Sequence, residues 1–174
     1  MQKSLTLILI LIFFTSQAQI TSNFTANDEG WTAAHTGGTA TAFEYVSTGG
    51  NPGGHLSASP PTSGGSVNIG MNWYWVAPVK FLGKHDFSYG QHIKFDLKQS
   101  TAGTDNTVSD IILRASGGQS IHLRLSEKPG TEWTSYSIPL DLSADWRSNS
   151  VAGNVAFEHE IRRQLNNLSK IQIR

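Results

Sequence analysis

Three consecutive aromatic residues, Trp73, Tyr74 and Trp75, are the residues of this chain best suited to bind a ligand. Exposed Trp and Tyr rings stack on the C–H faces of sugars, so a strand that carries them is typical of a carbohydrate-binding platform. Trp31 is the next candidate of this kind. The alternative is plain core packing, which is the commoner use of large aromatic side chains.

A second group of candidates consists of polar side chains on the predicted outward faces of two strands. These are His92, His122 and Arg124. The other outward positions are those of Lys94, Asp96 and Arg114. If the strands are neighbours, these side chains form a polar sheet face, and concave faces of β-sandwiches bind oligosaccharides through such mixtures of donors and acceptors. A solvated face without a ligand is the simpler alternative.

Signatures of metal and catalytic sites are weak. The six His show neither HxH nor HExxH spacing and the chain has no Cys, so we expect no zinc site. Asp28 and Glu29 carry oxygen atoms that suit half of a structural Ca²⁺ site, but a role in a turn or cap explains them better. No other cofactor is expected.

Enzymatic motifs are also missing from the sequence. There is no G-x-S-x-G, no phosphate loop and no dinucleotide fingerprint. The thirteen carboxylates are scattered over predicted loops and outward faces, which gives no support to a glycosidase pair. We therefore predict a protein that is not an enzyme.

Residues 1–19 predict a secretory signal peptide. Lys3 supplies the positive charge, the apolar run of residues 5–14 is too short to span a bilayer, and Ser16-Gln17-Ala18 resembles a cleavage site. Residues 20–174 then form one domain that is long enough to bury a core. Export without Cys excludes a disulfide scaffold and favours a bacterial extracellular protein. The formal net charge of zero favours neither nucleic acid nor an anionic membrane.

The elements that must position these residues are mostly strands. Residues 91–98 alternate strictly, with Ile93, Phe95 and Leu97 on one face. In the strand predicted at 67–76, Tyr74 lies on the opposite face from Trp73 and Trp75. Because Pro78 cannot donate a ladder hydrogen bond, that strand ends there or runs along an edge. Two further strands flank a turn at Gly117-Gly118. The remaining predicted strands are 20–25, 41–47, 55–59 and 133–140, and residues 32–39 are predicted as a loop.

One helix is predicted, over residues 156–168. Its apolar stripe is Phe157, Ile161, Leu165 and Leu168, and Asn154 is the expected cap. A strand with Ile171 and Ile173 follows and stops at Arg174, so we expect that a closing strand is missing from this chain. The predicted fold is all-β: a two-layer antiparallel β-sandwich of the jelly-roll, galactose-binding-like type, with one C-terminal covering helix.

The stretch APVKFLGKHDFSYGQHIKFDL resembles the laminin IV type A domain, also called the laminin B domain. Several separate motifs follow in the family's order: Ala77-Pro78, Phe81-Leu82-Gly83, Tyr89-Gly90, the strand at 110–115, Gly117-Gly118, Trp133, Trp146-Arg147 and the helix and strand after residue 158. Two departures from the family are the absence of Cys and the missing last strand.

The resemblance implies a non-catalytic extracellular module for adhesion or ligand binding, with an extracellular glycan or a matrix or surface protein as its partner. It assigns no binding residues. The alternative function is a carbohydrate-binding module that serves a secreted glycan-active enzyme, in which case Trp73 and Trp75 would hold the sugar.

Overall fold

The computed structural model describes residues 19–35, 40–59, 62–63, 66–67, 72–100 and 107–174. The predicted signal peptide lies almost entirely outside these residues and stays a prediction. Within the described residues, no helix is long and apolar enough to cross a membrane.

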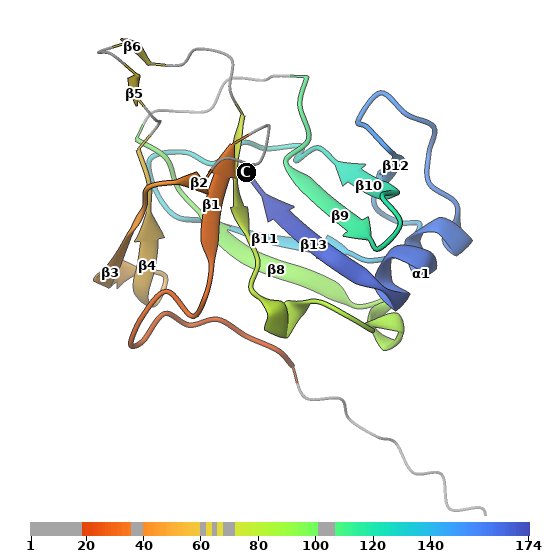
Figure 1. Ribbon diagram of the computed structural model, residues 1–174, viewed down its shortest axis with the longest axis horizontal. Coiled ribbons are helices and arrows are strands. Elements are labelled where there is room, and N and C mark those ends of the chain that lie inside the picture. Colours follow the sequence, from red (N-terminus) through yellow and green to blue (C-terminus); the bar gives the residue numbers. More distant parts are fainter. Residues whose placement is uncertain (1–18, 36–39, 60–61, 64–65, 68–71, 101–106) are drawn as a thin grey trace, which may run out of the picture.

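A seven-stranded antiparallel sheet forms the main layer (Figure 1). Its strands, in spatial order, are β12 (Arg147–Ser148), β10 (Ser120–Leu123), β9 (Ile111–Ala115), β13 (Leu168–Ile173), β7 (Trp73–Val76), β1 (Thr32–His35) and β2 (Ala40–Thr41). A second layer is the antiparallel pair of β8 (His92–Leu97) and β11 (Thr134–Pro139). Two further antiparallel strand pairs lie among the described residues: β3 (Glu44–Gly50) with β4 (Gly53–Ser57), and β5 (Thr62–Ser63) with β6 (Ser66–Val67).

The core lies between the two layers. Alternation in β9, β10 and β13 places one set of apolar side chains on the inner face of the seven-stranded sheet. These are Ile111, Leu113, Ile121, Leu123, Ile171 and Ile173, none more than 6% exposed. From the second layer, Ile93, Phe95 and Leu97 pack against them, as the alternation of β8 predicted. The all-β, two-layer antiparallel class is therefore confirmed.

The helix α1 (Glu158–Asn166) closes the core beside β9 and β10 (Figure 1). Ile161 and Leu165 are buried as predicted, but Phe157 is 65% exposed and does not belong to the apolar stripe. The predicted cap was also wrong: Phe157 occupies the cap position, and its N–H donates to Glu160 at 2.9 Å, where Asn154 was expected. Leu168 begins β13, so the chain turns directly from the helix into the middle of the sheet.

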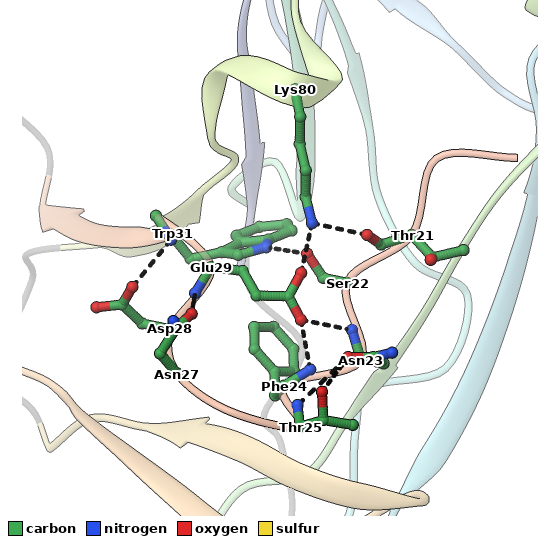
Figure 2. A network of polar contacts seen from close by, with 11 residues as sticks. Thr21, Ser22, Asn23, Phe24, Thr25, Asn27, Asp28, Glu29, Trp31 and Lys80 are labelled. Atoms are coloured by element: carbon green, nitrogen blue, oxygen red, sulfur yellow. Dashed lines mark hydrogen bonds and ion pairs between the residues drawn. The ribbon is translucent and has the colours of Figure 1, made fainter.

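The first described residues form a structured loop rather than a strand, which corrects the prediction for residues 20–25. Figure 2 shows the reason: the Glu29 carboxylate accepts the backbone N–H groups of Asn23 and Phe24, at 2.9 and 2.6 Å, and pairs with Lys80. These backbone donors are satisfied by a side chain and need no neighbouring strand. The Trp31 indole donates to Ser22 at 2.8 Å, which fixes the same loop.

The loop predicted for residues 32–39 is wrong in its first half. Thr32–His35 is β1, which pairs with β7 through four register positions, and Ala33 is 1% exposed. Residues 36–39 lie outside the described part of the chain.

A buried carboxylate joins the start of β9 to the end of β13. Asp110 is 1% exposed and accepts the N–H of Leu125 and the Arg174 guanidinium, both at 2.8 Å. It also pairs with Lys128. Two cations and a backbone donor therefore compensate the buried charge, as burial of an ionised group requires.

Candidate ligand-binding groove on the seven-stranded sheet

The outer face of the seven-stranded sheet, opposite the β8–β11 pair, is hollowed into a groove of about 510 Å³. The register of the strands explains which side chains meet there. Gln172, Ile112 and His122 lie opposite one another on β13, β9 and β10, and Lys170 and Arg114 form the adjacent row. Each alternates with an inner-face residue of the core, so all point to the outer side. Tyr74 of β7 also lines the groove.

His122 is held rigidly in the groove wall. Its Nδ1 lies 2.7 Å from the Ser109 hydroxyl oxygen, its Nε2 lies 2.8 Å from that of Ser120, and the residue is 7% exposed. Burial, reinforced by the positive charge of Arg114, lowers the pKa of His122 to about 4. The imidazole is therefore neutral at pH 7, with one nitrogen donating and the other accepting.

Tyr74 lines the groove without offering an open stacking surface. The residue is 6% exposed, and its hydroxyl donates to the Ser109 carbonyl oxygen at 3.1 Å. Burial raises the pKa of the Tyr74 phenol. The prediction that Tyr74 lies on the opposite face from the two Trp is confirmed, but its ring is part of the wall.

Positive charge is concentrated at this groove. Arg114 donates to the Gly118 carbonyl oxygen at 2.9 Å, and Lys170 is partly exposed beside it. In the described part of the chain neither side chain forms an ion pair with a carboxylate, and no Asp or Glu lines the groove. A ligand in the groove would therefore meet uncompensated cations.

A smaller hollow of about 240 Å³ adjoins the groove and shares Val151 with it. Arg147 lies there with its guanidinium 2.8 Å from the Asp145 carboxylate. Arg124 also lines this hollow, is exposed and has no ion-pair partner among the described residues. The outward orientation predicted for Arg124 agrees with this position.

Trp73 and Trp75 lie on the other face of β7 from the groove. Their rings contact each other edge to face, with centroids 5.2 Å apart, and Trp75 makes a similar contact with Phe43 at 5.8 Å. Both are partly buried. The three aromatics therefore pack as a cluster. Trp31, the other aromatic candidate, packs against the core beside Phe81, with centroids 5.7 Å apart.

His92 does not share a face with His122 and Arg124. It is exposed on β8, whose partner is β11, so it belongs to the second layer together with Lys94 and Asp96. The expectation of one polar face formed by both sets is wrong, because β10 pairs with β9 and β12 instead.

The acidic pair near the N-terminus is engaged in local structure. Glu29 takes part in the network of Figure 2, and the Asp28 carboxylate accepts the Gly30 N–H at 2.9 Å. Across the described residues, no group of three or more His, Asp or Glu side chains is placed to hold a metal ion. This arrangement agrees with the turn role that the sequence also allowed.

Lys170 and Gln172 are groove residues that the sequence interpretation missed. The signal was present, because both alternate with Ile171 and Ile173, which had been assigned to the core. The alternation does not reveal that β13 lies between β9 and β7. This position brings the two side chains next to Arg114 and Tyr74.

Comparison with known proteins agrees with this architecture. The chain is 26% identical over 159 residues to laminin subunit gamma-1 of Homo sapiens, which covers 89% of this chain and 9% of that protein. It is 28% identical over 167 residues to the Xenopus tropicalis gamma-1 subunit, covering 90% and 9%. The chain thus spans less than a tenth of the length of these relatives.

A solved structure shows the same fold. The L4b domain of human laminin alpha-2 superposes with a TM-score of 0.50 over 58% of each chain, at 18% identity. Residues 74–174 match the model of the family described as Laminin B (Domain IV). That match covers more than half of the chain and confirms the resemblance seen in the sequence. The chain belongs to the Laminin B (Domain IV) family.

Proposed function

We propose that this chain is a secreted, non-catalytic module of the laminin type that binds an extracellular partner through the groove on its seven-stranded sheet. The observation that carries the proposal is the coincidence of the family match with the groove. Residues 74–174 include its wall residues on β7, β9, β10 and β13. Adhesion to a matrix or surface component is the role we assign to that binding.

The chemistry of the groove supports binding rather than catalysis. Glycoside hydrolysis needs two carboxyl groups about 5–9.5 Å apart, and none of the described lining residues carries one. His122 has both ring nitrogens engaged by hydroxyl groups. This leaves its imidazole as a fixed hydrogen-bonding wall rather than a free general base.

Sugar binding on Trp73 and Trp75 is supported less well than binding in the groove. Their edge-to-face contacts with each other and with Phe43 use ring surface that a sugar would have to cover. Trp75→Ala is therefore expected to lower stability while leaving ligand binding intact. Loss of binding in a folded Trp75→Ala variant would instead favour the carbohydrate-binding module of a glycan-active enzyme.

The proposal is tested by filling the groove without changing its charge. Gln172 lies in the groove, whereas Ser137 is exposed on β11 in the second layer. We expect the purified protein to bind saturably to a component of an immobilised panel of matrix proteins and polysaccharides. Gln172→Trp should abolish that binding, and Ser137→Trp should preserve it.

Two results would overturn the proposed function. One is binding that survives Gln172→Trp unchanged. The other is turnover, measured as new reducing ends released from a polysaccharide panel by the wild-type protein.

A further inference from the structure

The charge pattern of the groove restricts the class of ligand that it accepts. Arg114 and Lys170 occupy directly paired positions on neighbouring strands, so their Cα atoms are about 5 Å apart. Arg114 donates to one carbonyl oxygen, and its guanidinium has five N–H donors in all. Because the described lining residues include no carboxylate, an anionic group would gain two cationic partners here and meet no like charge from these residues.

A second cationic position lies further along the same face. Arg124 follows β10 four residues beyond Ser120, the residue opposite Arg114. At a rise of about 3.3 Å per residue, the Cα atoms of Arg114 and Arg124 are roughly 14 Å apart. The groove and the adjoining hollow share the lining residue Val151. One ligand that reaches both positions must therefore carry anionic groups at separated points along its length.

Between the two cationic positions the groove wall presents the partly exposed amide of Gln172, which suits a hydroxyl group. His122 and Ser109 also lie in this wall, but each is 7% exposed and they hydrogen-bond to each other. Protein partners are usually anchored by aromatic residues in an apolar centre, but Tyr74, the Trp, Tyr or Phe side chain found among the described wall residues, is 6% exposed. The lining therefore matches a hydroxyl-rich polymer better than a protein surface.

We infer that the groove binds an acidic polysaccharide, whose carboxylate or sulfate groups contact Arg114 and Lys170 at one end and Arg124 at the other. This inference rests on the proposed function and specifies its ligand class. Because all three contacts are to a repeating charge, binding weakens as salt screens it. In the smaller hollow Arg147 pairs with Asp145, whose side chain is 67% exposed, so Arg124 supplies the net positive charge there.

The test measures binding of the purified full chain to four immobilised polymers: dextran sulfate, polygalacturonate, unmodified dextran and polyglutamate. We expect binding to at least one of the two acidic polysaccharides, and none to dextran or polyglutamate. Arg114→Gln/Lys170→Gln should weaken that binding about tenfold or more, since hydrogen bonds to charged groups contribute about 1.5–3 kcal/mol each.

A matched control removes two positive charges elsewhere. Lys84 and Lys94 are exposed and lie outside the groove, and the double variant Lys84→Gln/Lys94→Gln should bind like the wild type. Arg124→Gln is a second variant, in the adjoining hollow. Because the Arg124 side chain is exposed, this variant should fold even if the Arg114 variant does not. It should weaken binding about threefold.

Several results would overturn the inference. They are equal loss in the control double variant, equal binding to dextran, equal binding to polyglutamate, and no binding to either acidic polysaccharide. In each of these cases the proposed function is judged separately by Gln172→Trp on the wider panel, because that variant blocks the groove whatever the ligand's charge. Binding that responds to Gln172→Trp but not to the Arg114 and Lys170 substitutions would leave the function standing and refute its acidic ligand.

Discussion

Acidification should destabilise the folded chain through His122, and the structure gives the size of the effect. Burial, reinforced by Arg114, lowers the pKa of His122 from 6.5 to about 4. Between these two values the unfolded chain binds a proton that the folded chain excludes, so the free energy of unfolding falls as the pH falls from about 6.5 to about 4. The shift corresponds to about 3 kcal/mol of stability, which is present at pH 7 and lost as the pH falls to 4.

The perturbation that isolates this contribution is His122→Gln. A Gln side chain can donate to one Ser hydroxyl and accept from the other, as the neutral imidazole does, but it does not titrate. The free energy of unfolding, measured by urea denaturation at pH 4 to 7, should vary less in this variant than in the wild type by about 3 kcal/mol. The control is His92→Gln, because His92 is exposed on β8.

The comparison has a clear negative outcome. Every other group that titrates in this range is present in both proteins and cancels in the difference. If the free energy of unfolding of His122→Gln has the same pH dependence as that of the wild type, the pKa of His122 is not lowered by folding. The hydrogen bonds of the imidazole to Ser109 and Ser120 would then be wrong. A weaker pH dependence of the free energy of unfolding in His92→Gln would also contradict the assignment of this effect to His122.

Three further predictions concern the packing around the groove and the N-terminal loop. Burial alone would raise the pKa of Glu29, but the Lys80 ammonium and the backbone N–H groups of Phe24 and Asn23 lower it to about 2. Because this ion pair is partly exposed and screened by solvent, the stability that it contributes is about 2 kcal/mol, less than the full shift implies; it is present above pH 4.5 and lost as the pH falls towards 2. Glu29→Gln should remove that acid-sensitive contribution, and a variant as stable as the wild type at pH 7 would argue against the network of Figure 2. Asp110→Asn should cost about 3 kcal/mol in urea denaturation, since it leaves two partly buried cations without their carboxylate; a loss below 1 kcal/mol would mean that the ion pairs are solvated. Trp146 is 0% exposed and donates to the Pro139 carbonyl oxygen at 2.8 Å, so Trp146→Ala should cost about 3–5 kcal/mol, whereas an unchanged thermal midpoint would place its ring outside the core.

The alternation of apolar and polar residues predicted the orientation of side chains in the strands well. Ile93, Phe95 and Leu97 pack inward because a half-buried strand imposes a period of two on its apolar residues. The same reasoning correctly separated Tyr74 from its two Trp neighbours. By contrast, Thr32–His35 has no such pattern, and it is a strand because β7 offers it a pairing edge from far along the chain.

The sequence did not predict which strands pair, and the composition of the groove depends on that pairing. Outward faces were assigned correctly to both His92 and His122, but β8 pairs with β11 while β10 pairs with β9 and β12. Which strands become neighbours is decided by long-range packing rather than by local pattern. Lys170 joins Arg114 for the same reason, since β13 inserts between β9 and β7.

The most direct test of ligand binding in the groove is to map the contact by NMR. The amide resonances of the ¹⁵N-labelled protein would be followed during titration with a size-defined acidic oligosaccharide, such as oligogalacturonate or a sulfated dextran fragment. We expect the largest shifts to cluster on β9, β10 and β13, at Arg114, His122 and Gln172. Shifts confined to β8 and β11, or centred on Trp73 and Trp75, would contradict it.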